Sequence, residues 1–311
     1  MKRHYYIIKG IVLLAAMLLA ACSSSDSDDS PIATSQNEIH LTTNVTSMPS
    51  GTRTTTYDDA GLKSEGSFTC VAYEANTTTP YISPTTTVDW NSKNSRWEFN
   101  GGASHYYWPI PSSNVDTWRS LDFFAYVPAT KPSYITTGPN YSADHHVTFS
   151  CDMRNTATKE FMFGMALGQN GGNVPETGVP LQFLHPFARV RFKLSDASGT
   201  SVKINSITLG GNYNKTADYS YDGSTSTWSN LGNESDFGIC QLNTDYLVIP
   251  SNYGSRTLTV NATWDEWSAV TRDISTTVDF DWGSPGYSYT YVLTLKKYVL
   301  IVDTEKYTEQ W

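Results

Sequence analysis

Few residue combinations in this sequence could do chemistry. Its six histidines are scattered, and His145-His146 is their one adjacent pair. Neighbouring residues of a strand point to opposite faces, so these two imidazoles could bind one metal ion only across a bend. Acidic clusters such as Asp58-Asp59, Asp265-Glu266 and Asp279/Asp281 are more typical of solvated turns than of the paired carboxylates of a glycosidase. No nucleophile elbow, phosphate loop or calcium loop is present. We therefore expect no enzyme, no metal site and no cofactor.

Three cysteines, Cys70, Cys151 and Cys240, lie far apart in the chain. No Cys-x-x-Cys or paired-histidine spacing accompanies them, which argues against a zinc site and against an obligatory disulfide framework. We expect them to be small buried side chains on strands. One incidental disulfide among the three remains open.

Cys22 stands apart from the other cysteines because of what precedes it. Lys2, Arg3 and Lys9 are followed by an apolar segment, 10–21, that is too short to span a bilayer. This order is typical of a secretory signal peptide, here residues 1–21. Leu-Ala-Ala before Cys22 resembles the bacterial lipobox, in which the thiol is lipidated and the chain is cut before it. An ordinary signal peptide followed by a chance cysteine is the alternative.

Residues 22–36 are predicted to be a disordered tether. Their first part, 23–30, consists of Ser and Asp alone and has no apolar side chain to pack. A Ser/Asp cluster behind a lipidated cysteine also resembles the surface-export signal of Bacteroidetes lipoproteins. That resemblance implies a surface-exposed lipoprotein of the cell outer membrane, whereas a plain linker is the alternative.

Charge excludes one class of partner. Three of the 21 Lys and Arg lie in the predicted signal peptide, so 18 remain against 30 Asp and Glu, a net charge of −12. A chain this acidic is unsuited to nucleic acid or to anionic lipid headgroups.

The rest of the chain is rich in aromatic, Thr, Ser, Asn and Gly residues and has no long helical repeat. A turn-rich break at 196–200 separates two sets of about seven short strands. This arrangement predicts an all-β fold with two tandem antiparallel sandwiches, residues 37–197 and 198–311. The predicted strands are 39–45, 68–73, 97–99, 121–127, 146–151, 160–167 and 181–194, then 202–209, 219–221, 226–231, 246–249, 258–264, 272–280 and 287–302.

Two of these segments have a particular pattern. Residues 121–127 are apolar on both faces, which is typical of a central strand covered on both sides. In 181–194 the apolar phase shifts at Pro186, which we interpret as a bulge within one long strand. Arg189, Arg191 and Lys193 are then expected on its solvent-exposed face.

The tryptophans admit two interpretations. Buried, they fill two thin cores, which is the commoner arrangement. Exposed on one face, they could stack on sugar rings, as expected of a glycan-binding surface lipoprotein of a polysaccharide-uptake system. The residues concerned are Trp90, Trp97, Trp108, Trp118, Trp228, Trp264, Trp267 and Trp282.

Several stretches, taken in order, resemble the Mfa-like branch of the fimbrillin family, the type V pilins of Bacteroidetes. They are Tyr107-Trp108-Pro109, Leu121 to Pro128, Leu181 to Val190, Tyr246 to Pro250 and the strand ending at Trp311. The resemblance implies two transthyretin-like β-sandwiches and export as a lipoprotein. It further implies that a trypsin-like outer-membrane protease cuts after an arginine beyond the first strand. Loss of that strand opens a groove that a strand of the next subunit fills.

Matching residues are present at the front of the mature chain. Ile39, Leu41 and Val45 form an amphipathic strand, the predicted donor-strand element. Arg53-Thr54 follows in a polar segment of the kind where proteases cut, and an ordinary loop arginine is the alternative. Removal of the strand would leave backbone groups and apolar pockets that a neighbour's strand can satisfy. Such a head-to-tail contact does not close and therefore builds a fibre.

The predicted function is a structural subunit, shaft or tip, of a surface fimbria that supports adhesion. The expected partners are other fimbrial subunits, the maturation protease, the outer membrane through lipid on Cys22, and a host or bacterial surface ligand. Val299 to Val302 and the tail 303–311 are either a mobile donor strand or the fixed last strand of a tip or anchor. In this family, anchors keep their lipid and are not cleaved.

Overall fold

The computed structural model describes residues 38–45, 58–75, 77–110, 118–142, 146–154, 160–195, 202–266, 268–296 and 299–310. Cys22, Arg53, Thr54 and His145 lie outside these ranges, as do the predicted signal peptide and tether. Within them, no helix is both long enough and apolar enough to cross a membrane.

Strands dominate the described residues, which confirms the all-β prediction. The described ranges contain one α-helix, α1 (Asp59–Glu65), and a short 3₁₀ turn, η2 (Asn100–Gly102). The strands of the first half are β1 (Leu41–Val45), β2 (Ser67–Glu74), β3 (Pro80–Ile82), β4 (Thr87–Asn91), β5 (Arg96–Phe99), β6 (Leu121–Val127), β7 (Ile135–Tyr141), β8 (Val147–Asp152), β9 (Met162–Gln169), β10 (Val179–Leu184) and β11 (Ala188–Leu194). Those of the second half are β12 (Val202–Leu209), β13 (Asn212–Tyr213), β14 (Thr216–Tyr221), β15 (Ser226–Gly232), β16 (Ser235–Asp236), β17 (Ile239–Cys240), β18 (Asp245–Val248), β19 (Asn252–Glu266), β20 (Ser268–Asp281), β21 (Tyr287–Lys296) and β22 (Val299–Gln310).

The first sheet closes on itself. Strands β2, β4, β5, β1, β10, β9 and β6 pair in that order, and β6 pairs back onto β2; β3 lies outside this ring on β2. Inside the ring, buried side chains from every strand share one apolar core with Leu62 of α1. A closed ring has no free edge, so each of its strands is paired on both sides.

A second core lies on the outer face of the ring strands β2, β6 and β9. The sheet β15-β14-β8-β7 covers that face. Strand β6 serves both cores, because Phe123 and Ala125 point into the ring whereas Phe124 packs in the second core. The prediction that 121–127 is a strand covered on both sides is confirmed. Its one acidic residue, Asp122, is buried and accepts a hydrogen bond from the Gly168 amide at 2.7 Å.

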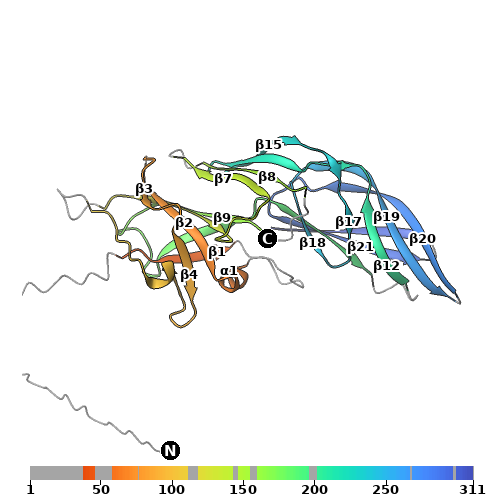
Figure 1. Ribbon diagram of the computed structural model, residues 1–311, viewed down its shortest axis with the longest axis horizontal. Coiled ribbons are helices and arrows are strands. Elements are labelled where there is room, and N and C mark those ends of the chain that lie inside the picture. Colours follow the sequence, from red (N-terminus) through yellow and green to blue (C-terminus); the bar gives the residue numbers. More distant parts are fainter. Residues whose placement is uncertain are drawn as a thin grey trace, which may run out of the picture. The chain divides into compact units, whose positions relative to one another are not determined.

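Strand β11 and strands of the second half form a sandwich. One sheet has the order β18-β11-β21-β22 and the other β17-β12-β19-β20, in which β19 and β20 form the long blue hairpin of Figure 1. Alternating apolar residues of both sheets fill a third core, where Trp264 and Trp282 are 1% and 0% exposed. Period-two alternation places such residues on the inner face.

The prediction of one bulged strand over 181–194 is wrong. The chain forms two strands, β10 in the ring and β11 in the sandwich, joined through His185, Pro186 and Phe187. The shift of apolar phase marks where the chain passes from one core to another, and Pro186 has no N–H to continue a ladder. His185 is buried there, its Nδ1 hydrogen-bonded to the buried Glu160 carboxylate.

The expectation that the basic residues of β11 face solvent is wrong for Arg191. Arg191 is only 7% exposed, and its guanidinium binds both carboxylate oxygens of Asp245 on the neighbouring strand β18. Arg189 lies 3.7 Å from the same carboxylate. The pairing of β11 with β18 creates this contact, and two segments so distant in sequence could not be paired in advance.

The predicted strand 287–302 is also two strands. β21 and β22 form an antiparallel hairpin, with Lys296 paired to Val299. Neither Gly nor Pro marks the reversal, so the apolar pattern continues across it.

Strands from both sides of residue 197 share sheets. Strand β11 pairs with β21, and the hairpin β14–β15 adds to β8. The division into domains 37–197 and 198–311 stays a prediction. The sheets do not divide at residue 197, because two of them contain strands from both sides of it.

Cysteines and tryptophans behave as structural residues. Cys70, Cys151 and Cys240 are free and buried, as expected. Among the described tryptophans none is exposed: Trp97, Trp108, Trp264 and Trp282 are buried, and Trp90, Trp118 and Trp228 are half-buried.

Candidate strand-exchange site

Strand β1 lies between two ring strands that come from distant parts of the chain. It pairs in parallel with β10 over its full length, Leu41 to Val45 against Val179 to Phe183. On its other side it pairs antiparallel with β5 at a single position, Leu41 opposite Trp97. Most of its backbone pairing is therefore with β10.

The three predicted donor-strand residues all point into the ring. Ile39, Leu41 and Val45 are 1%, 3% and 3% exposed and belong to the ring core. Phe68, Trp97 and Phe183 lie in the same core, with the two phenyl rings 5.4 Å apart and Phe68 4.8 Å from Trp97. Removal of the segment 38–45, which contains β1, would take three apolar side chains from this aromatic core and unpair the facing edges of β5 and β10.

A close backbone approach fixes the register of β1. The Val179 amide donates a 2.7 Å hydrogen bond to the His40 carbonyl. Gly178, at φ +118°, passes so near that a Cβ there would lie 2.7 Å from the same carbonyl oxygen. Only glycine tolerates both this φ and this contact.

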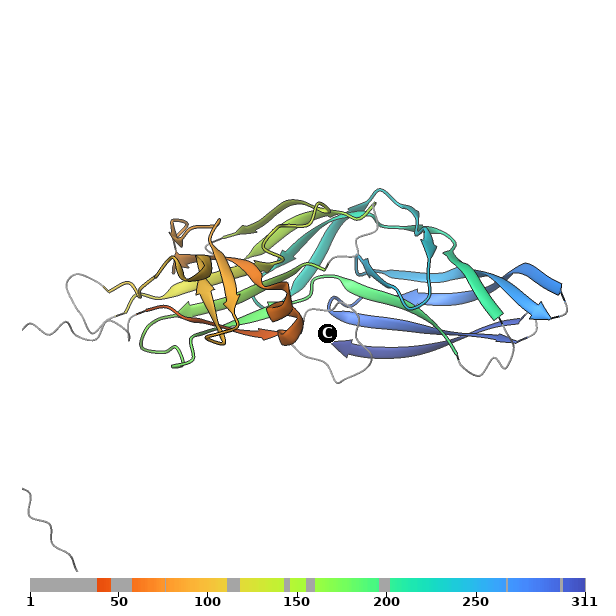
Figure 2. The same ribbon diagram turned by 60° about the horizontal axis from the view of Figure 1, so that its bottom comes forward.

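Helix α1 contacts β1. Figure 2 shows the helix beside the end of that strand. Asp58 caps the helix by accepting a 2.6 Å bond from the Gly61 amide, and Gly66 ends it in the left-handed conformation. Thr43 donates to Asp59 at 3.3 Å and accepts from the Trp97 indole at 3.2 Å. The helix therefore holds the polar side of the strand.

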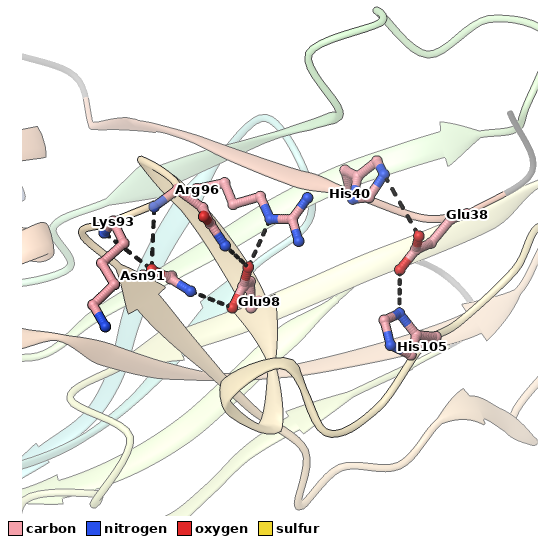
Figure 3. A network of polar contacts seen from close by, with 8 residues as sticks. Glu38, His40, Asn91, Lys93, Arg96, Glu98 and His105 are labelled. Atoms are coloured by element: carbon pink, nitrogen blue, oxygen red, sulfur yellow. Dashed lines mark hydrogen bonds and ion pairs between the residues drawn. The ribbon is translucent and has the colours of Figure 1, made fainter. Parts of the chain in front are cut away.

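The segment just before β1 is held by polar contacts (Figure 3). Glu38 Oε1 is hydrogen-bonded to His105 Nδ1 at 2.5 Å, and His40 Nε2 lies 3.9 Å from the other Glu38 oxygen. The Ile39 amide donates to the Tyr106 carbonyl at 2.7 Å. The side chains of Glu38, His40 and His105 are partly exposed, so their contacts position the strand but add little to the stability of the fold.

The β4–β5 hairpin carries a carboxylate with a displaced pKa (Figure 3). Glu98 accepts hydrogen bonds from Asn91 at 2.8 Å, Asn94 at 3.0 Å and Arg96 Nε at 2.7 Å. Because all three favour the ionised form, the pKa of Glu98 falls to about 2.

This carboxylate gives an acid-dependence prediction. A group whose pKa is lower in the folded chain stabilises it above the unfolded pKa and loses that contribution as pH falls through the folded pKa. For Glu98 the loss runs from about pH 4.5 down to about pH 2. We expect Glu98→Gln to flatten the fall of Tm between pH 5 and pH 3 relative to the unaltered chain. Thermal unfolding monitored by circular dichroism measures this, with the exposed Glu176→Gln as control. Parallel Tm curves for Glu98→Gln and the unaltered chain would contradict it.

Strand β22 is an edge strand. Within the described residues it pairs with β21 alone. Leu300 is buried in the sandwich core, whereas Val299 and Ile301 are 56% and 40% exposed. An edge strand with exposed apolar side chains is a template for pairing with another chain.

The predicted site residues divide into two groups. Ile39, Leu41 and Val45 are brought together in the ring core, while Cys22, Arg53 and Thr54 lie outside the described residues. Sequence reasoning missed α1 and Gly178. An Asp N-cap and a Gly at C′ could have revealed the helix, whereas nothing local indicates what Gly178 approaches.

Other kinds of site were also sought. Within the ranges that the structure describes, no group of three or more His, Cys, Asp or Glu side chains could hold a metal ion.

Comparisons with known proteins agree with this architecture. Two solved structures share the fold. One is a fimbrial protein from Bacteroides vulgatus, with a TM-score of 0.56, 17% identity and coverage of 88% of this chain and 100% of that chain. The other, from Bacteroides uniformis, is a protein proposed to act in cell adhesion, with a TM-score of 0.52, 14% identity and coverage of 86% and 97%. A search of curated proteins found no match.

The closed ring that includes β1 and the sandwich with its edge strand β22 define an all-β protein of the fold that these two structures share. The Fimbrillin-like family model matches residues 37–311, and the chain belongs to that family. Membership confirms the resemblance noted in the sequence and supports a role as a fimbrial subunit.

Proposed function

We propose that this chain is a structural subunit of a cell-surface fimbria that assembles by strand exchange. It is exported as a lipoprotein through Cys22 and reaches the outer face of the outer membrane. A trypsin-like protease then cuts between Arg53 and Thr54 and releases β1, and a strand of a neighbouring subunit fills the groove. The enclosed position of β1 in the ring is the observation that carries the proposal.

The position of the cut relative to β1 supports this order of events. Arg53 follows the strand, so cleavage there separates Ile39, Leu41 and Val45 from the rest of the chain in one step. The cleaved fragment then stays bound only through non-covalent contacts with β10, β5 and α1.

The edge strand β22 is the proposed donor for the next subunit. It has one pairing neighbour among the described residues and exposes Val299 and Ile301. Their spacing of two residues matches that of Ile39 and Leu41, so both could point into one groove. In this role the chain is a shaft subunit, whereas a tip or anchor would keep β22 in place.

We also propose that the chain is not an enzyme and that adhesion arises from the assembled fimbria. The glycan-binding alternative requires tryptophans exposed on one face. The burial or half-burial of the described tryptophans counts against it.

Cleavage of the purified precursor tests the proposal. We expect a trypsin-like protease to produce a chain that begins at Thr54 and then forms oligomers, as measured by N-terminal sequencing and light scattering. Arg53→Gln, which removes the cut site, should stay monomeric. A synthetic peptide of residues 38–45 added during cleavage should occupy the groove and suppress the oligomers. The same peptide with Leu41→Asp is the matched control and should not.

Two results would overturn strand exchange. One is a cut chain that stays monomeric without peptide. The other is equal formation of oligomers with the unaltered peptide and with the Leu41→Asp peptide. Occupancy of the groove would then have no effect on assembly.

A further inference from the structure

The row of side chains that β1 directs toward the ring contains one polar member. Side chains two residues apart on a strand share a face, so Thr43 lies in the same row as Leu41 and Val45. The two aliphatic side chains are buried, whereas Thr43 is half-buried. The Thr43 hydroxyl accepts a 3.2 Å hydrogen bond from the Trp97 indole N–H and donates a 3.3 Å bond to Asp59 Oδ1. One place in an otherwise apolar row is therefore both an acceptor and a donor.

The Trp97 indole depends on β1 for its hydrogen bond. Trp97 is 4% exposed, and among the described residues the Thr43 hydroxyl is the partner of its N–H group. An indole N–H can only donate, and when it is buried it usually has an acceptor. Loss of β1 therefore leaves a donor without its acceptor in the wall of the groove.

Residues outside β1 hold this indole in place. The rings of Phe68 and Trp90 contact Trp97 edge-on, with centroids 4.8 Å and 5.1 Å away. Lys63 of α1 places its ammonium 4.9 Å from the Trp90 ring centroid and lies 3.8 Å from the Asp59 carboxylate. These contacts join β2, β4, β5 and α1 and do not pass through β1. We therefore expect the indole N–H and the Asp59 carboxylate to keep their places when β1 leaves.

These two groups restrict the side chain that can lie between them. A hydroxyl suits both, because it accepts from Trp97 and donates to Asp59. A carboxylate in the same place would face the Asp59 carboxylate, and an ammonium has no lone pair for the indole. An aliphatic side chain would leave the buried N–H unpaired, which costs more than the missing bond is worth in water. Sites built to hydrogen-bond a hydroxyl discriminate strongly against analogues that lack it.

We propose that the groove left by β1 selects an incoming strand that carries Ser or Thr in the place of Thr43, between apolar residues in the places of Leu41 and Val45. This inference rests on the proposed strand exchange and adds to it the side-chain pattern of the partner strand. The apolar places supply affinity for any amphipathic strand. The Trp97 indole supplies specificity, because an unpaired polar group penalises the wrong partner.

Peptides of residues 38–45 test this selection on the protease-cut full chain. The measured quantity is the peptide concentration that halves oligomer formation, followed by light scattering. Thr43→Val keeps the branched shape and is more hydrophobic, yet we expect it to need about tenfold more peptide, because it leaves the indole N–H unpaired. Thr43→Ser keeps the hydroxyl and should stay within about threefold of the unaltered peptide. Thr42→Val, the same change on the opposite face of the strand, is the matched control and should also stay within about threefold.

Trp97→Phe in the protein provides the reciprocal test. It removes the donor, so the Thr43→Val peptide should then be at least as potent as the unaltered peptide. A preference for threonine that persisted in this chain would contradict the role of the indole.

The peptide comparison separates this inference from strand exchange itself. Equal potency of the unaltered and Thr43→Val peptides on the unaltered chain would overturn the selection and leave strand exchange standing. An unaltered peptide that does not suppress the oligomers would overturn strand exchange, and the selection with it. Both results come from the protein without substitutions, so they decide the question even if Trp97→Phe does not fold.

Discussion

Replacing Leu41 by aspartate should lower the free energy of unfolding by about 3–5 kcal/mol, because a charge would replace a buried aliphatic side chain in the ring core. Leu41 is 3% exposed and is the one residue of β1 paired on both sides, to Val179 and to Trp97. Denaturant unfolding followed by circular dichroism measures the loss.

Asn44→Asp provides the matched control for this substitution. It adds the same charge to the same strand, but at an exposed position. We expect its free energy of unfolding to stay within about 0.5 kcal/mol of the unaltered chain. If Leu41→Asp were equally mild, β1 would not be part of the core, and the proposed groove would lose its physical basis.

Glu160→Ala should be similarly destabilising, by about 3–5 kcal/mol, since it removes the carboxylate of a buried, hydrogen-bonded pair and leaves a cavity in its place. The side chains of His185 and Glu160 are 2% and 5% exposed, and they lie at the crossing from the ring to the sandwich. Glu160→Gln keeps a hydrogen-bonding group in place and should lose less. Both are measured by denaturant unfolding.

A surface ion pair serves as the comparison. Glu74 bonds Arg119 at 2.7 Å, but the two side chains are 28% and 49% exposed. Glu74→Ala should therefore change the free energy of unfolding by about 1 kcal/mol or less. A Glu160→Ala chain as stable as Glu74→Ala would show that the His185–Glu160 contact is not desolvated.

Local pattern predicts the strands well where one face is buried. Residues 121–127 and 202–209 are strands with the predicted bounds, because alternation or a double apolar face identifies them directly. It misses β3, β4 and β7, which are rich in Thr, Pro and Asn and owe their pairing to neighbours. The predicted strand 181–194 covers both β10 and β11, and the predicted strand 287–302 covers β21 and part of β22. Apolar periodicity carries no information about which sheet a residue belongs to.

The candidate site was predictable in part. The inward direction of Ile39, Leu41 and Val45 follows from their spacing and is confirmed. That their neighbours are β5 and β10 depends on pairings between segments far apart in the chain, Leu41 with Trp97 and with Val179, which no local pattern encodes.

The two neighbours of β1 run in opposite directions, since β1 is parallel to β10 and antiparallel to β5. A strand that replaces β1 would therefore meet one parallel and one antiparallel neighbour whichever way it enters. Backbone pairing gives little preference for either polarity, because parallel and antiparallel ladders differ only slightly in stability per residue. The polarity of a fimbria built on this groove would be decided by side chains, through the match between the incoming residues and the places left by Ile39, Leu41 and Val45.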